Sequence, residues 1–541
     1  MRASHIYMFF YLTLIVCSVV IKLIWWDDPF GGYKYDRQLS TLHTIEAYAR
    51  VGIDFFRPER YTVQPWERFV VLELSIYQAL SAWVSGFTET ALSAARGTNL
   101  FFSLLTLPVV FQIAALYFSR KAAAYAVLFY TFAPLNLMYQ SATLIDVSTT
   151  FFATTAYWLL AKYFKGSKST TLFFMFLLVS VCCVVTKPLY FLPSGILLIT
   201  HFLQQQRWSQ PNNILDYIIQ HRGIIGAFIL IALVMLLWVE IQKQVNNGLS
   251  PLPLSLSFNH LIDPLFYLRT IFRWVLVVLN PVTSLFFVLG VLFLYRDHRR
   301  CERIALIYSI LAYYLIFGHN VTPHEYYVLA MIPFASVIAG RGACWMEERI
   351  QVEFRVRSSH ALPAAISLGS VVCSVLIFSI NFVAAQSLEQ RTANIEKEMH
   401  NVLEQGQYSF IYADQTNFPI RDHVVYNRTA KLKYFLGLLS EEQIRLYASP
   451  IRSPEILRRL KTYGTVKLIF SMGDKLFQNS ERDVPLELDV EKIQALYQQH
   501  LRYLIFYRLT EEAKIEIKNR IKNYKLTHES INWLVYDLAS G

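Results

Sequence analysis

Apolar runs long enough to cross a membrane recur through the first 385 residues of this chain and limit the folds open to it. A helix needs about 20 apolar residues to cross the hydrocarbon core, where every backbone polar group must be bonded within the protein. The composition agrees, because hydrophobic residues make up 54% of the 541 residues and charged residues only 16%. The sequence therefore predicts a polytopic α-helical membrane protein.

The predicted spans number about eleven. Their approximate bounds are 6–26, 97–118, 123–140, 145–163, 171–187, 189–204, 223–240, 275–295, 303–318, 326–342 and 361–384. The first run ends in Trp25 and Trp26, which suit the water interface, and no small-residue cleavage site follows it. We therefore expect this run to remain as an uncleaved anchor.

Basic residues between the apolar runs predict the orientation of the chain. The short basic loops lie at 119–121, 162–168, 296–303 and 341–357. They all fall on the side of the N-terminus in the predicted alternation, and Lys and Arg gather in cytoplasmic loops. We therefore expect a cytoplasmic N-terminus, and we interpret the formal charge of +11 as a sign of topology, not of nucleic-acid binding.

Residues 1–385 form the predicted transmembrane module, and residues 386–541 differ from them in lacking long apolar runs. Strand patterns occur at Tyr408–Tyr412, Val466–Phe470 and Trp533–Tyr536, and helical patterns at Ser453–Tyr463 and Asp489–Leu504. This mixture predicts a compact C-terminal α/β domain on the extracytoplasmic side. All six cysteines lie outside it and form no CxxC pair, so we expect neither a disulfide framework nor structural zinc.

The first extracytoplasmic loop, 27–96, is predicted to hold two interfacial helices. In the first, within 35–60, the residues that share one side at helical spacing are Leu42, Ile45, Tyr48, Ala49 and Gly52. The second covers 69–86 and carries Glu73 among apolar neighbours. From periodicity alone, both helices could simply cover the loop against lipid.

Three short motifs occur in order on the predicted outer face. The first joins Arg37-Gln38, Thr41, Ala49-Arg50 and the sequence Phe55-Phe56-Arg57-Pro58. The second is Glu73-Leu74-Ser75-Ile76-Tyr77-Gln78, and the third is His324-Glu325-Tyr326-Tyr327 with Pro333. Together with the order of the parts, these motifs resemble the GT-C class of membrane-embedded glycosyltransferases, in the group of protein O-mannosyltransferases and lipid A aminoarabinose transferases. The resemblance covers roughly residues 1–345.

One feature departs from that family. Its members place an acidic residue, often an Asp-Glu pair, soon after the first span, whereas this chain has Asp27-Asp28 and Asp36 without that pair. Asp36 is the preferred match because it adjoins Arg37. Asp27 and Asp28 could equally cap the end of the span.

The resemblance implies transfer of a sugar from a polyprenyl phosphate to a hydroxyl group with inversion. Such a reaction needs a base for the hydroxyl, and Asp36 is the leading candidate, although it could instead pair with Arg37 or Lys34. Glu73 is the second catalytic candidate, because a charge within an apolar run is expected to face a polar cavity or a partner. An ion pair of Glu73 with Arg50 or Arg96 is the alternative.

Cations on the same face are candidates for binding the departing phosphate. These are Arg37 beside Gln38, Lys187 between two spans, and His324. Lys187 could instead extend its charge to the interface, and Asp146, at the start of a span, could orient a cation or a sugar hydroxyl or cap the helix. Tyr326 and Tyr327 could stack on a sugar or an isoprenoid, or belong to an aromatic belt.

The resulting expectation is a glycosyltransferase of a cell membrane, with the bacterial inner membrane as the expected location and the active site outside. Its partners would be a polyprenyl-phosphate sugar, a lipid, glycan or protein acceptor, and membrane lipid. No cofactor is assigned; the acidic residues could coordinate a divalent cation, but they show no metal-ligand spacing. The alternative is a transporter or flippase of lipid-linked saccharides, for which paired halves would be expected but are not apparent.

Overall fold

The computed structural model describes most of the helical part of the chain and three strands near its C-terminus. The described ranges are 35–56, 71–140, 142–167, 169–208, 214–246, 259–296, 301–321, 324–353, 362–380, 503–507, 525–529 and 533–537, with a few isolated residues. The predicted span 6–26 lies almost entirely outside them. Two compact units divide the chain, the larger mainly Phe69–Ala384 with Arg37–Glu59, and the smaller mainly Ala385–Gly541.

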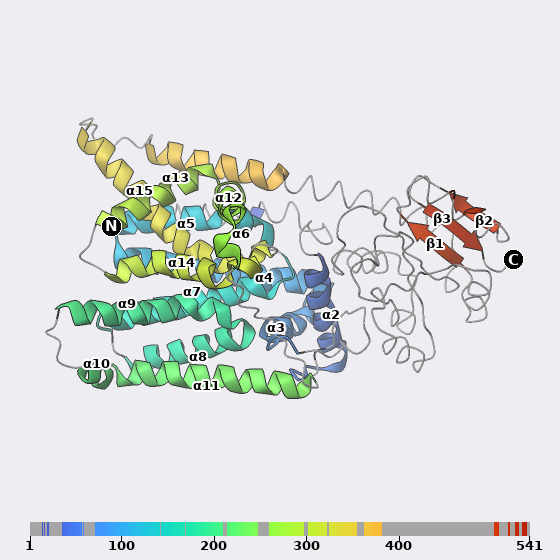
Figure 1. Cartoon of the computed structure of the whole chain (residues 1–541), viewed down its shortest axis with the longest axis horizontal. Helices are drawn as coiled ribbons and strands as arrows, with labels where there is room; N and C mark the ends of the chain where they lie inside the picture. Colours follow the sequence, from blue (N-terminus) through green and yellow to red (C-terminus); the bar gives the residue numbers. More distant parts are fainter. Residues whose placement is uncertain are drawn as a thin grey trace. The chain divides into compact units, whose positions relative to one another are not determined.

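The larger unit is helical, and in it the long helices run side by side as a bundle with α2 and α3 at one end (Figure 1). The helices are α2 (Tyr35–Val51), α3 (Ile76–Ser85), α4 (Ala91–Tyr117), α5 (Arg120–Thr131), α6 (Pro134–Tyr139), α7 (Ile145–Phe164), α8 (Thr170–Thr186), α9 (Leu192–Trp208), α10 (Ile214–Gln220), α11 (Arg222–Val245), α12 (Pro264–Arg273), α13 (Pro281–Arg296), α14 (Cys301–Val321), α15 (Ile332–Glu353) and a helix over Leu362–Ile380. Short turns of 3₁₀ or π geometry form η2 (Pro188–Phe191), η3 (Asn259–Ile262), η4 (Trp274–Val278) and η5 (Glu325–Met331).

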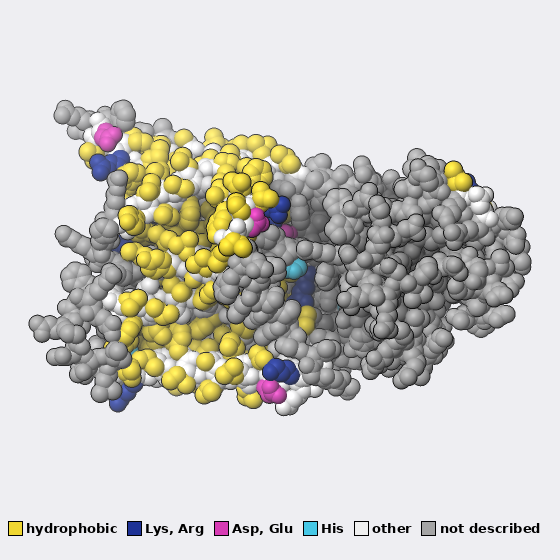
Figure 2. Space-filling model, viewed as in Figure 1, with side chains coloured by type: hydrophobic (Ala, Val, Ile, Leu, Met, Phe, Trp, Pro, Cys, Tyr) yellow, Lys and Arg dark blue, Asp and Glu magenta, His cyan; other side chains and the backbone are white. Residues whose placement is uncertain are grey.

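Four helices among the described residues are long and apolar enough to cross a membrane, and a bent pair would make five. The four are Ala91–Tyr117, Arg222–Val245, Glu325–Glu353 and Leu362–Ile380. The visible outer face of the bundle is largely covered by hydrophobic side chains (Figure 2), as contact with lipid requires. A polytopic membrane fold is therefore confirmed, whereas the total of about eleven spans stays a prediction.

Two predicted spans are interrupted in the structure. The span predicted at 123–140 is divided into α5 and α6, because Pro134 begins a new helix and has no N–H to continue the previous one. The span predicted at 275–295 begins in a π turn and bends by 118° before α13. Asn280 lies in this bend at a φ of 66°, a conformation in which asparagine is one of the tolerated residues.

Helix α2 buries much of the face that the sequence predicts. Leu42, Ile45 and Tyr48 are buried, but Ala49 and Gly52 are exposed, so the prediction was wrong at its C-terminal end. The helix ends there, because Gly52 takes a φ of 96° and donates its N–H to the carbonyl oxygen of Tyr48.

The second predicted helix of the first loop, 69–86, is shorter than expected. Helix α3 begins only at Ile76, and the backbone before it is not helical. The reason is tertiary bonding: the N–H and the carbonyl of Val71 both bond to the side chain of Asn246, at 2.8 and 3.0 Å. Glu73 therefore lies in an irregular segment and not on a helix.

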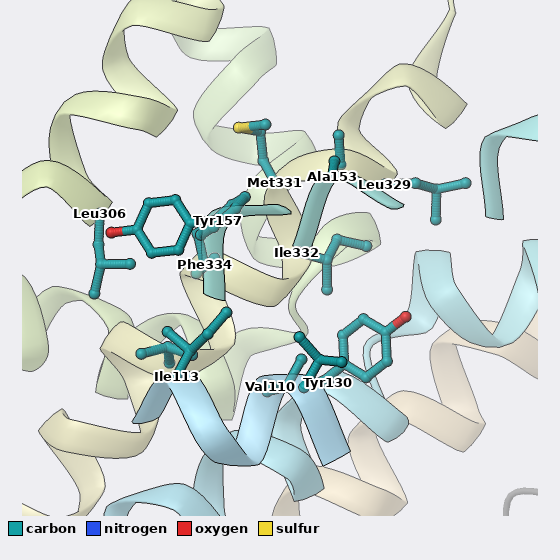
Figure 3. Close-up of a cluster of buried hydrophobic side chains, with 14 of the residues drawn as sticks. Val110, Ile113, Tyr130, Ala153, Tyr157, Leu306, Leu329, Met331, Ile332 and Phe334 are labelled. Carbon is teal, nitrogen blue, oxygen red and sulfur yellow. The ribbon is translucent and has the colours of Figure 1, made fainter. Parts of the chain in front are cut away.

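The centre of the bundle is closely packed between α4, α5, α7 and α15. Figure 3 shows Val110, Tyr130, Tyr157 and Phe334 among the side chains that fill it, and the rings of Tyr157 and Phe334 meet edge to face at 4.9 Å. Helices α5 and α15 approach backbone to backbone at Gly340, where an added Cβ would lie 2.7 Å from the nitrogen of Ala126. Small residues permit such contact between helices in a membrane.

The described part of the smaller unit is an antiparallel sheet in the order β1-β3-β2. Its strands are β1 (Tyr503–Tyr507), β2 (Lys525–Glu529) and β3 (Trp533–Asp537). The predicted strand 533–536 is confirmed, but the predicted helix 489–504 is wrong at its end, where two residues pair in β1 with β3. The other predicted elements of this domain, at 408–412, 453–463 and 466–470, lie outside the described residues.

Candidate functional site

Asp146 and Lys187 form an ion pair where α7 begins and α8 ends. The Nζ atom of Lys187 lies 2.5 Å from Oδ1 of Asp146, and the hydroxyl of Tyr190 donates to the same oxygen at 2.5 Å. The Asp146 side chain is 0% exposed and that of Lys187 is 14% exposed. Pro188 produces this arrangement: it favours an extended Lys187 and opens the 3₁₀ turn η2 that carries Tyr190.

Aromatic rings surround the ammonium group of Lys187. Its Nζ lies 5.5 Å from the ring centre of Tyr190, 5.0 Å from that of Tyr326 and 4.3 Å from that of Tyr327. The ring of His324 lies 5.6 and 5.4 Å from the two tyrosines of η5. The structure thus brings three of the predicted site residues, Asp146, Tyr326 and Tyr327, around the ammonium group of Lys187, with His324 packed against the two tyrosines.

Arg37 and Glu73 form a second ion pair. Nη2 of Arg37 donates to Oε2 of Glu73 at 2.8 Å, and the amide of Gln78 donates to Oε1 at 3.4 Å. Burial has the largest single effect and lowers the pKa of Arg37, but the charge of Glu73, the hydrogen bond to it and the two nearby tyrosines together raise the pKa by more. The pKa therefore lies above its ordinary value, and Arg37 remains a cation.

The two ion pairs are neighbours. Tyr326 and Tyr327, which face Lys187, also contribute to the electrostatic environment of Arg37. The backbone links the pairs as well, because the N–H of Leu74 donates to the carbonyl of Val185 near the end of α8, at 3.0 Å. The same end of α8 therefore helps to position Glu73 and Lys187.

Gln38 is buried and bonds to the loop before α7. Its Oε1 accepts the N–H of Thr143 and its backbone carbonyl accepts the hydroxyl of Thr143, each at 3.1 Å. These bonds fasten α2 to the segment that leads into Asp146. Contact of Gln38 with substrate stays a prediction.

Asp36 lies in α2, beside Arg37, but its side chain is outside the part of the chain that the structure describes. Its role as the base therefore stays a prediction. Glu73 and Asp146, by contrast, are each engaged with a cation. The first helical residue of α7 is Ile145, and Asp146 makes no capping hydrogen bond, so its described contacts orient Lys187 and Tyr190.

Three residues of this region were given no role from the sequence, although Glu325 stands within the third motif. The first is Tyr190. The sequence Lys187-Pro188-Leu189-Tyr190 could have predicted its proximity to Lys187, because a proline that begins a 3₁₀ turn keeps the flanking side chains close. The others are Tyr139 and Glu325, whose hydroxyl and Oε1 lie 2.7 Å apart. Their pairing joins α6 to η5 and leaves no mark in the sequence.

Within the described ranges, no group of three or more His, Cys, Asp or Glu side chains is placed to hold a metal ion. A divalent cation at this site stays a prediction.

Comparison with known proteins reveals similarity in structure. No protein-family model matches the sequence, and no curated protein matches it. ArnT from Cupriavidus metallidurans, in the structure bound to undecaprenyl phosphate, matches over 97% of both chains with a TM-score of 0.59 and 11% identity. The apo structure of that protein matches over the same shares, with a TM-score of 0.60 and 11% identity. This chain has the fold of ArnT. The GT-C fold implied by the sequence is thereby confirmed.

Proposed function

We propose that this protein is an inverting glycosyltransferase that moves a sugar from a polyprenyl-phosphate donor to a hydroxyl group of a lipid, glycan or protein. The observation that carries the proposal is the pair of fixed cations, Arg37 and Lys187, at one end of a bundle with the ArnT fold. One of the ArnT structures holds undecaprenyl phosphate, which belongs to the class of lipid that the proposed reaction releases.

The proposed chemistry is a single displacement at the anomeric carbon. The acceptor oxygen bonds to that carbon, the bond from carbon to phosphate oxygen breaks, and polyprenyl phosphate leaves with the electron pair. Arg37, Lys187 and His324 stabilise the charge that grows on the phosphate, and cations held in advance do so most effectively where water is excluded. Attack from the face opposite the phosphate inverts the configuration.

Asp36 is the proposed acceptor of the hydroxyl proton. Glu73 is the second candidate, but its ion pair with Arg37 favours its ionised form and so opposes uptake of a proton. Glu73 and Asp146 then serve chiefly to hold the two cations in place.

The proposed orientation puts this end of the bundle outside the cytoplasm. Asp146 begins α7 and Lys187 follows α8, and the alternation of spans predicts the outer face for both positions. Tyr326 and Tyr327, which surround Lys187, would pack against the sugar or the isoprenoid. The domain formed by residues 386–541 is proposed to lie on the same side of a bacterial inner membrane.

The test follows free polyprenyl phosphate in proteoliposomes supplied with several polyprenyl-phosphate sugars and a crude envelope fraction as the acceptor. Wild type is compared with Asp36→Asn and Lys187→Gln. Asp54→Asn, an exposed aspartate near the end of the same loop helix, and Lys165→Gln, at the end of α7, are the matched controls.

Sugar-dependent release is expected from wild type and both controls, and loss of release is expected from Asp36→Asn and Lys187→Gln. Release that survives in Asp36→Asn would move the base to Glu73. If no donor were consumed although the acceptor fraction supported a known transferase, the proposed function would be wrong.

A further inference from the structure

Glu325 is a carboxylate of the site region that has no cation partner among the described residues. It opens η5, is half-buried, and receives one hydrogen bond, from the hydroxyl of Tyr139 to Oε1 at 2.7 Å. Within the described ranges, its other oxygen, Oε2, accepts no hydrogen bond. The two other carboxylates described here, Glu73 and Asp146, are instead each bonded to a cation.

Tyr139 fixes the orientation of this charge. The tyrosine is 1% exposed at the end of α6, and its ring meets that of Tyr326 edge to face at 6.2 Å. A charge-assisted hydrogen bond from a buried donor holds the Glu325 carboxylate in one position. A half-buried carboxylate without a cation partner is unfavourable unless water or a ligand solvates it.

The position of Glu325 in the chain places it among the residues proposed to touch the donor. His324 precedes it, and Tyr326 and Tyr327, which surround the ammonium group of Lys187, follow it. A carboxylate beside aromatic rings offers a sugar an acceptor for its hydroxyl hydrogens and a surface for its apolar face. The same carboxylate repels a sugar that carries its own negative charge.

On the basis of the proposed function, we infer that Glu325 selects the transferred sugar: Oε2 accepts a hydrogen bond from a sugar hydroxyl, and its charge excludes acidic sugars such as uronic acids. The donor class is therefore a polyprenyl-phosphate sugar without a carboxylate. This role belongs to substrate selection and differs from the phosphate binding proposed for Arg37 and Lys187.

The test measures kcat/KM for pairs of donors that differ only in oxidation at C6. The probes are undecaprenyl-phosphate glucose, galactose and mannose and their three uronate counterparts, assayed with wild type, Glu325→Gln and Glu348→Gln. The control residue, Glu348, lies on α15 and pairs with Arg341. Glutamine at position 325 keeps an oxygen for Tyr139, removes the charge, and puts an amide NH2 donor where Oε2 accepts a hydrogen bond.

Wild type is expected to prefer the neutral member of each pair that it uses. Glu325→Gln should reduce this preference by about tenfold or more, mainly by raising kcat/KM for the uronate, since unfavourable like-charge contacts across an interface are strong. Glu348→Gln should leave the preference unchanged. Tyr139→Phe, which removes the bond that orients Glu325, should reduce the preference less than Glu325→Gln does.

Two results would overturn the inference. One is a wild type that prefers a uronate, and the other is a Glu325→Gln variant that transfers sugar with an unchanged preference. Absence of transfer from every donor by wild type would instead contradict the proposed function on which the inference rests. Elution as a single species in gel filtration identifies variants that have folded.

Discussion

The ion pair between Asp146 and Lys187 allows a quantitative test of the site. Substitution of Lys187 by methionine removes the cation and leaves a carboxylate that is 0% exposed, with the hydroxyl of Tyr190 as its described hydrogen-bond donor. Substitution of Asp146 by asparagine leaves an ammonium group that still faces aromatic rings and is 14% exposed. The first change should therefore be more damaging than the second.

The magnitudes follow from burial. Breaking a buried ion pair by removing one partner costs about 3–5 kcal/mol. The cost of Lys187→Met should lie near the lower end of this range, at about 3 kcal/mol, because water reaches the lysine side of the pair. Asp146→Asn should cost about 1–2 kcal/mol, since the neutral amide can still accept from Tyr190. The double variant buries no unpaired charge. Its loss of unfolding free energy should therefore be about 2 kcal/mol smaller than the sum of the losses in the two single variants.

The assay is a double-mutant cycle on unfolding free energies, measured by reversible unfolding in mixed micelles of dodecylmaltoside and sodium dodecyl sulfate. The control cycle uses Arg341 and Glu348, whose side chains are 15% and 50% exposed. A pair of this exposure should couple by less than about 1 kcal/mol. Coupling between Asp146 and Lys187 no larger than in the control cycle would refute the argument that burial makes this pair strong.

Three further changes test other parts of the structure. Tyr190→Phe removes a donor to Asp146 and should lower the rate of sugar transfer with little change in the expression of folded protein, as followed by the release assay. Gly340→Ala should destabilise the protein by about 1–3 kcal/mol, because the added Cβ would clash with the backbone of α5. Gly97→Ala is the control: its added Cβ has no neighbour within 4 Å, so this change should be neutral or stabilising in the same unfolding assay. Asn246→Ala should leave two buried backbone groups unbonded, cost about 2 kcal/mol and reduce transfer by displacing Glu73; unchanged stability would contradict this.

Much of the site could be anticipated because its residues lie at the ends of apolar runs. Lys187 was notable as a lysine on the face that basic residues avoid, and Asp146 as a carboxylate where a span begins. His324 and the two tyrosines after it begin another long apolar stretch. Successive spans alternate in direction, so every second connection lies on the same face of the membrane. The sequence therefore predicts that these residues lie at one end of the bundle, although it gives no information about their contacts.

The partners within the site could not be anticipated in the same way. Arg37 and Glu73 are 36 residues apart and Asp146 and Lys187 are 41 apart, and periodicity specifies a face of an element but not its neighbour. The expectation of a helix through Glu73 failed for the same reason. Local hydrophobicity favoured a helix there, but bonds from Asn246 and Val185 satisfy the backbone of that segment in another conformation.

The pattern of residues along the chain is sufficient to identify a helical membrane protein whose polar residues gather at the ends of its helices. Hydrophobic length and charge act locally, so they can be read along the chain. The three-dimensional packing was needed to show that Glu73 holds Arg37, that Tyr190 and Lys187 share one oxygen of Asp146, and that Glu325 has no cation partner in the described part of the chain. These outcomes depend on how the helix ends pack together, because an ion pair or hydrogen bond forms only between atoms that packing has brought within about 3 Å.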